Sequence, residues 1–144
     1  MDFNMKLNYN YSSWLYLASS MLFVALWTFT GIEKLLGFSA FQQAMMNQTI
    51  PVVWAKLLAP IIIIAELGLA LLLVFKTTKR LGMLFSSLLM TVFTTYIGLV
   101  WMGAFPRIPC SCAGFIESMG WEGHFLFNVG FIVLGMFGVM GREP

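Results

Sequence analysis

Residues 54–75 read WAKLLAPIIIIAELGLALLLVF, and this stretch decides the fold. Its only charged side chains are Lys56, close to the start, and Glu66. A transmembrane helix needs roughly 20 mainly apolar residues, and this run meets that length. The bilayer core offers no water to bond free backbone groups, so a run of this kind must be helical. We therefore predict a membrane-spanning helix from Trp54 to Phe75.

Three further apolar runs are long enough to cross a bilayer. They extend from Trp14 to Ile32, from Leu81 to Ala104, and over residues 122–140, with the apolar part of the last beginning at His124. The 144-residue chain is 60% hydrophobic and only 10% charged, whereas soluble domains carry about 25% charge. No small-x-small cleavage site follows the first run, so we expect it to be retained as a span. The sequence predicts one all-α domain over residues 1–144, a polytopic four-transmembrane-helix bundle.

The segment between the first two spans, GFSAFQQAMMNQTIP at residues 37–51, has an amphipathic pattern. Its apolar side chains recur at helical spacing: Phe38, Phe41, Met45 and Ile50. The opposite side is polar: Gln42, Gln43, Asn47 and Gln48. The pattern predicts a short interfacial helix at the membrane surface, stopped by Pro51. A partly ordered loop remains the alternative.

The orientation follows from the basic residues outside the spans. Four spans place both termini and the second connection on one side, with these charges: Lys6, Lys76, Lys79, Arg80 and Arg142. The other side holds Lys34, Lys56 and Arg107. Cytoplasmic loops carry the excess of Lys and Arg. We expect a multi-pass protein of the bacterial cytoplasmic (inner) membrane, with both termini cytoplasmic and the connection containing Arg107 periplasmic.

Glu66 lies near the middle of the second span, which Trp54 and Lys76 flank almost equally. A charge at that depth costs a few kcal/mol or more, so the side chain must face the bundle interior and find a partner. One interpretation is functional: a proton relay, or a contact to the head group of a bound quinone. The other is structural: a protonated Glu66 bonds hydroxyls of the third span. The candidates are Ser87, Thr91, Thr94 and Thr95.

Two other features of the spans lead to smaller expectations. Pro60, six residues before Glu66, should loosen the second helix because proline lacks a backbone N–H. Glu33 and Lys34 close the first span and read as an ordinary interfacial pair.

The only two cysteines lie in PCSC, residues 109–112. A disulfide between these two cysteines would stabilise the fold only weakly, because a disulfide stabilises least when the loop that it closes is short. As a metal site, Cys110, Cys112 and His124 supply three ligands where structural zinc takes four. A strained, accessible pair makes a reducible disulfide. Arg107 would favour a thiolate, and His124 could exchange protons near it. The other interpretation of His124 is an interfacial residue that caps the end of a helix. Redox exchange is therefore the leading interpretation, with no metal expected.

The cysteine count limits that mechanism. A thiol relay across the membrane needs a second dithiol at the opposite face, and the chain has only Cys110 and Cys112. Electrons must pass to a quinone in the bilayer or to another protein's thiols on the same side. Asn128, inside the fourth span, is expected to bond a neighbouring helix.

Three segments together carry a family resemblance: WTFTGIEKLLGFSAFQQAM (27–45), LAPIIIIAELGLALLL (58–73) and IPCSCAGFIESMGWEGHFLFN (108–128). They resemble the DoxX-like superfamily and, within it, MauE-type proteins associated with methylamine utilisation. The resemblance extends from about residue 14 to residue 137. Its most specific positions are Pro109, Cys110, Cys112, Gly114, Trp121, His124 and Asn128.

The resemblance implies a four-helix membrane protein that supports redox maturation of exported proteins. MauE-type members are linked to formation of the disulfide-rich small subunit of methylamine dehydrogenase, and DoxX-type members to thiosulfate:quinone oxidoreductase. We do not carry methylamine over as a substrate. The implied exchanging pair is Cys110 and Cys112, with His124, Glu66, Arg107 and Asn128 in supporting roles by our own inference.

Two classes of function follow. The first is a component of a membrane thiol–disulfide oxidoreductase, whose partner is a periplasmic thioredoxin-like or cysteine-containing protein and whose electron sink is a quinone. The second is a non-enzymatic anchor or scaffold that binds other membrane subunits; a small-solute transporter ranks third. The net charge of +2, with no basic run beyond KTTKR, argues against nucleic acid as a partner.

Overall fold

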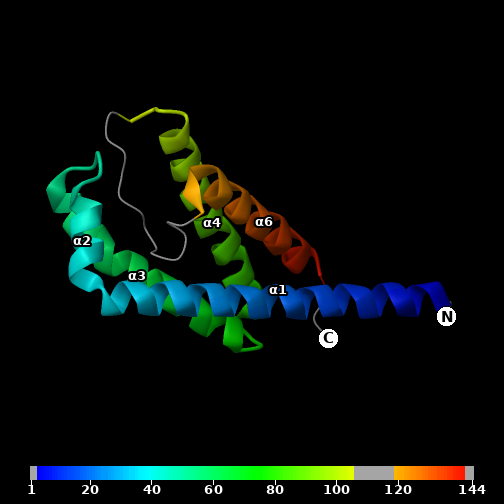
Figure 1. Cartoon of the computed structure of the whole chain (residues 1–144). Coiled ribbons are helices and arrows are strands. Elements are labelled where there is room, and N and C mark those ends of the chain that lie inside the picture. Colours follow the sequence, from blue (N-terminus) through cyan, green and yellow to red (C-terminus); the bar gives the residue numbers. More distant parts are fainter. Residues whose placement is uncertain (1–2, 106–118, 142–144) are drawn as a thin grey trace.

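The apolar runs form four long helices in the computed structural model, which describes residues 3–105 and 119–141, with side chains from residue 11 onward. Figure 1 shows them with a short fifth helix after the first. In chain order they are α1 (Phe3–Leu36), α2 (Phe38–Met46), α3 (Val52–Val74), α4 (Lys79–Trp101) and α6 (Gly120–Met140). The described ranges contain no strand, so the all-α prediction is confirmed.

Each long helix has the length and composition to cross a membrane. The candidate spans are Tyr11–Leu36, Val52–Val74, Lys79–Trp101 and Gly120–Met140. The chain is therefore a multi-pass membrane protein, as its composition indicates. The clearest disagreement concerns the first span, which was predicted to end at Ile32. The helix continues to Leu36, and Lys34, which was expected to close the span at the membrane boundary, is buried inside the bundle.

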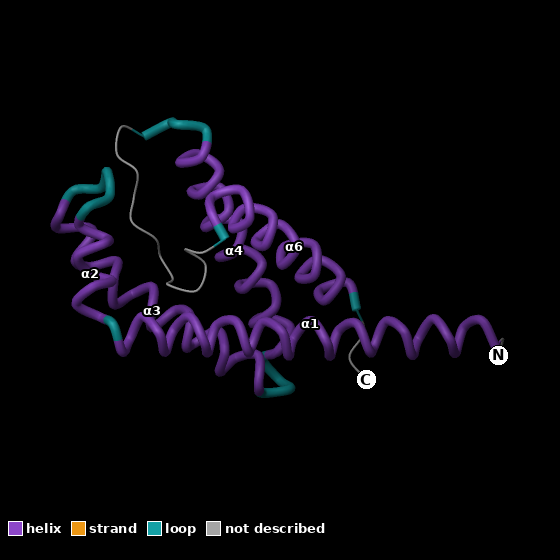
Figure 2. The backbone as a smooth tube through the Cα atoms, in the orientation of Figure 1, coloured by secondary structure: helices purple, strands orange, loops and turns teal. Residues whose placement is uncertain are grey.

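The helices pack as two antiparallel pairs, α1 along α3 and α4 along α6. In Figure 1 the N-terminal part of α1 extends beyond the other helices. Figure 2 shows the tight connection between α3 and α4. Gly31 allows the first pair to approach closely, because a Cβ atom there would lie 2.7 Å from Cδ2 of Leu67. The close contact brings the end of α1 to the level of Glu66, near the middle of α3.

Because α1 stops opposite the middle of α3, another element must cover the first half of α3. That element is α2, whose Phe41 and Met45 pack against Ala55, Ala59 and Ile63. The prediction of a short helix between the first two spans is confirmed. Its apolar residues face the protein, however, instead of lipid.

Pro60 does not interrupt α3, which runs unbroken from Val52 to Val74. Proline removes one backbone hydrogen bond inside a helix. Contacts of Ala59 and Ile63 with α2 hold this part of the helix in place.

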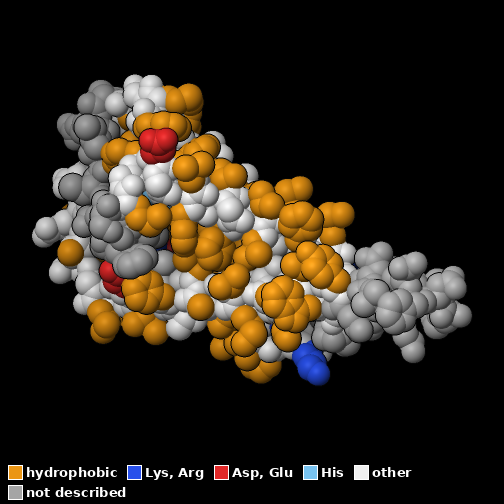
Figure 3. Space-filling view, turned by 45° about the vertical axis from the view of Figure 1, so that its right-hand side comes forward, with side chains coloured by type: hydrophobic (Ala, Val, Ile, Leu, Met, Phe, Trp, Pro, Cys, Tyr) orange, Lys and Arg blue, Asp and Glu red, His pale blue; other side chains and the backbone are white. Residues whose placement is uncertain are grey.

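Trp27 lies at the centre of the bundle and is 2% exposed. Its indole Nε1–H donates to Oγ of Ser86 on α4 at 2.9 Å. The Phe23 ring stacks beside it at 6.4 Å, and the Phe93 ring meets it edge-on at 6.3 Å. Around this core the described surface is largely apolar, as expected of helices in lipid (Figure 3).

Gly138 is where α1, α4 and α6 meet, and we expect Gly138→Leu to lower the free energy of unfolding by about 1–3 kcal/mol. A Cβ atom at Gly138 would overlap Cε of Met83 and lie 3.1 Å from Cβ of Ser19. The larger side chain must therefore push α6 away from α1. Thermal unfolding in detergent micelles measures the effect.

Gly130→Leu provides the matched control on the same helix. Gly130 is exposed, and nothing lies within 4 Å of a Cβ atom placed there. Equal melting temperatures for the two variants would contradict the close packing at Gly138.

Candidate functional site

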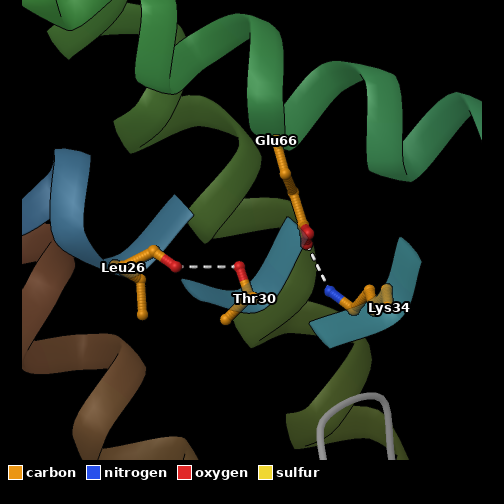
Figure 4. A network of polar contacts seen from close by, with 4 residues as sticks. All are labelled: Leu26, Thr30, Lys34 and Glu66. Carbon is orange, nitrogen blue, oxygen red and sulfur yellow. Dashed lines mark hydrogen bonds and ion pairs between the residues drawn. The ribbon is translucent and has the colours of Figure 1, made fainter. Parts of the chain in front are cut away.

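A buried ion pair joins α1 to α3. Nζ of Lys34, two residues before the end of α1, contacts Oε1 of Glu66 (Figure 4). Lys34 is 7% exposed and Glu66 0%, and both lie inside candidate spans. Charges in a membrane interior require such a partner, because neither side chain can reach water.

Aromatic rings complete the surroundings of the ammonium group. Nζ of Lys34 lies 5.6 Å from the ring centroid of Phe41 on α2 and 5.9 Å from that of Phe93 on α4. Both distances suit a cation–π interaction, which is strongest where water is excluded. Four helices therefore contribute to this site: α1 and α3 supply the ion pair, and α2 and α4 supply the rings.

Thr30 lies one turn before Lys34 and beside the carboxylate of Glu66 (Figure 4). Its hydroxyl donates to the Leu26 carbonyl at 3.0 Å. Oε2 of Glu66 is buried and has no hydrogen-bond partner among the side chains that the structure describes. Buried polar atoms are nearly always paired. This oxygen is thus an open position for a proton or a hydrogen-bond donor.

The predicted partners of Glu66 on the third span are wrong. The four hydroxyls instead donate to carbonyls four residues earlier in α4: Ser87 to Met83, Thr91 to Ser87, Thr94 to Met90 and Thr95 to Thr91. The prediction that Lys34 belongs to an ordinary interfacial pair is also wrong. The need of Glu66 for a partner was a usable signal, but the predicted end of the first span at Ile32 placed Lys34 at the membrane edge.

The first turns of α6 bring two more predicted residues to the same end of the bundle. His124 is half-buried, in the first turns of α6. Asn128, one turn later, is 3% exposed. The ring of Phe125 lies 5.8 Å from that of Trp101, which fixes the start of α6 against the end of α4. The structure therefore places His124 and Asn128 at the end of the bundle where α1 ends and Lys34 lies.

Cys110, Cys112 and Arg107 lie outside the described residues, in the connection from Phe105 to Met119. The described start of this connection is anchored, since the Phe105 ring lies 5.8 Å from that of Tyr96. The Tyr96 hydroxyl in turn donates to Oε1 of Gln48, just after α2. Gln48 is 4% exposed, so its predicted place on the polar side of the short helix is wrong.

A largely apolar groove of about 1010 Å³ runs along another face of α1. Glu33 lines it towards the end of α1, and Leu73, Val74 and Lys79 line it where α3 passes into α4. A groove of this kind on a membrane helix is suited to lipid chains. Glu33 thus faces away from the site that Lys34 enters.

These features define a small polytopic membrane protein with a charged pair enclosed in its helix bundle. The family model of the methylamine utilisation protein MauE matches residues 12–141, and the chain belongs to this family. No curated protein and no solved structure matches the chain significantly.

Proposed function

We propose that this MauE-family protein supports the maturation of exported proteins by thiol–disulfide exchange through Cys110 and Cys112. One observation carries the proposal: both cysteines fall in the connection between α4 and α6, which leads directly into the first turns of α6, where His124 lies. The partner is a periplasmic thioredoxin-like or cysteine-containing protein. Its dithiol gives two electrons and two protons to the Cys110–Cys112 disulfide, which becomes a dithiol as the partner's disulfide forms.

The burial of Lys34 supports the orientation that this exchange needs. Lys34 is paired inside the bundle, so it does not count among the charges of the connecting segments. The outer side then holds two basic residues, Lys56 and Arg107, and the other side holds five. The positive-inside rule then favours cytoplasmic termini more strongly than the sequence count alone. The cysteine connection faces the periplasm of a bacterial inner membrane in this proposal.

Regeneration of the disulfide requires an electron acceptor, and we assign this role to a membrane quinone. When bound, a quinone takes up two electrons and two protons. Residues suited to its head group are present: Oε2 of Glu66 is a free polar atom inside the span, and the rings of Phe41 and Phe93 lie around Lys34. The sequence resemblance to the DoxX-like superfamily supports this assignment, because its DoxX-type members are linked to thiosulfate:quinone oxidoreductase.

Thiol labelling in intact cells tests the exchange. A membrane-impermeant maleimide is expected to label Cys110 and Cys112 only after reduction, because the resting pair is a disulfide. Cys112→Ser and Cys110→Ser are expected to abolish exchange, and one of them should accumulate a mixed disulfide with the partner. The matched control is Ser111→Ala, which keeps both thiols and should exchange normally.

A non-enzymatic anchor or scaffold is the second candidate, and the exposure of α6 favours it. Its exposed large side chains are Leu126, Val133, Met136, Phe137 and Met140. These residues offer a contact surface to another membrane subunit. If a double Cys→Ser variant keeps full function and still co-purifies with a partner, the scaffold is correct and the exchange proposal is wrong.

A further inference from the structure

The Lys34–Glu66 pair has features that an ion pair would not need if it only held α1 against α3. We propose that Lys34 and Glu66 form a buried proton-exchange site, connected through His124 to the end of the bundle that carries the cysteine segment. The coupling of this site to Cys110 and Cys112 rests on the proposed function, whereas the site itself is argued from the ion pair and its surroundings alone.

The first argument concerns the cost of the pair. Taking two charges out of water costs several kcal/mol per ion, and well-packed apolar residues often stabilise a protein equally well. The contact of α1 with α3 already has close packing, with Gly31 against Leu67. An ionisable pair inside a membrane span therefore indicates a function beyond holding the helices together.

The second argument is that the site suits two protonation states. In the charged state, Lys34 donates to Oε1 of Glu66, and the rings of Phe41 and Phe93 stabilise the ammonium. In the protonated state, a carboxyl group needs an acceptor for its new O–H. Thr30 offers one, since its own proton goes to the Leu26 carbonyl and leaves its lone pairs available. A protonated Glu66 carboxyl group thus has a hydroxyl acceptor beside it on α1.

The third argument is the connection to the bundle end. His124 is half-buried in the first turns of α6, at the end of the bundle where α1 ends with Lys34 in its last turn. The other elements around the pair present no second charge to it among the described side chains. Towards Lys34, α2 and α4 present the rings of Phe41 and Phe93, and Glu33 of α1 lines the separate groove. His124 is therefore the described titratable group placed to exchange protons with the pair.

The proposed step balances as follows. Conversion of the Cys110 and Cys112 thiols into a disulfide forms one S–S bond and releases two electrons and two protons. The electrons reduce a membrane quinone, whose two oxygens take up two protons. His124 accepts protons at the bundle end, and Glu66 holds one inside the span until it is delivered.

Infrared difference spectroscopy on the purified protein in lipid nanodiscs without quinone tests the site. Difference spectra are recorded between oxidised and reduced cysteines, and separately between two pH values. We expect the carbonyl band of a protonated carboxylic acid to change in both. This band should be lost in Glu66→Gln and kept in Glu33→Gln, the matched control. A band unaffected by Glu66→Gln, or no carboxylic acid band in either experiment, would overturn the proposal.

Two further variants allow the proposal to be tested even if Glu66→Gln does not fold. Thr30→Val keeps the ion pair and removes the acceptor, so the carbonyl band should persist at a shifted frequency. His124→Phe should keep the band but slow proton uptake after a pH jump by about 100-fold. An unchanged band frequency in Thr30→Val would contradict the role of Thr30 as acceptor. An unchanged rate of proton uptake in His124→Phe would contradict the role of His124 in proton exchange. A band that responds to pH but not to cysteine oxidation would support the site and contradict its coupling to the proposed exchange.

Discussion

Lys34→Met is expected to lower the free energy of unfolding by about 3–5 kcal/mol, because it leaves Glu66 buried without its partner. Glu66 is 0% exposed, and its second oxygen already lacks a hydrogen bond within the described part of the chain. Glu66 must then either stay charged with neither an ammonium group nor water to stabilise it or take up a proton, and both cost free energy relative to the ion pair. Denaturant unfolding in detergent micelles, followed by tryptophan fluorescence, measures the loss.

The double variant Lys34→Met/Glu66→Met separates stability from function. Replacing both members of a buried pair by apolar residues is often neutral or stabilising, so this variant should be close to wild type in stability. It should nevertheless lack the infrared band of Glu66. Lys76→Met, which removes an exposed lysine, controls for the loss of a positive charge. A single variant as stable as the double one would show that the ion pair does not form.

Trp27→Ala is expected to cost about 3–5 kcal/mol, the usual range for removing a large buried aromatic side chain. Trp27 packs against Phe23 and Phe93 and donates a hydrogen bond to Ser86 on α4. Alanine would leave a cavity at the centre of the bundle and an unpaired hydroxyl beside it. The same unfolding measurement in micelles detects the change.

Two controls identify the source of that loss. Trp27→Phe keeps most of the ring and removes only the N–H donor, so it should cost about 1 kcal/mol, as interhelical hydrogen bonds in membranes do. Trp14→Ala removes a tryptophan of the same helix that is 65% exposed, and it should leave stability unchanged. If all three variants behave alike, Trp27 is not the centre of the core.

Part of the candidate site was predictable from single residues. Glu66 was recognised because an ionisable group in the middle of residues 54–75 is costly and must face inward. His124 was recognised from its place at the start of the fourth span. Lys34 was missed because its position in the chain, just before α2, resembles a membrane boundary. Its depth depends on the level at which α1 packs against α3, which no local pattern encodes.

The order of apolar and polar residues along the chain was enough to predict which segments cross the membrane and that they are helices. The reason is that lipid leaves apolar runs of this length no other way to bond their backbone groups. Only the tertiary structure decided that α1 stops opposite the middle of α3, that α2 covers the other half, and that Lys34 therefore meets Glu66. That register is set by contacts between distant side chains, such as Gly31 against Leu67, where the absence of a Cβ atom allows the helices to approach.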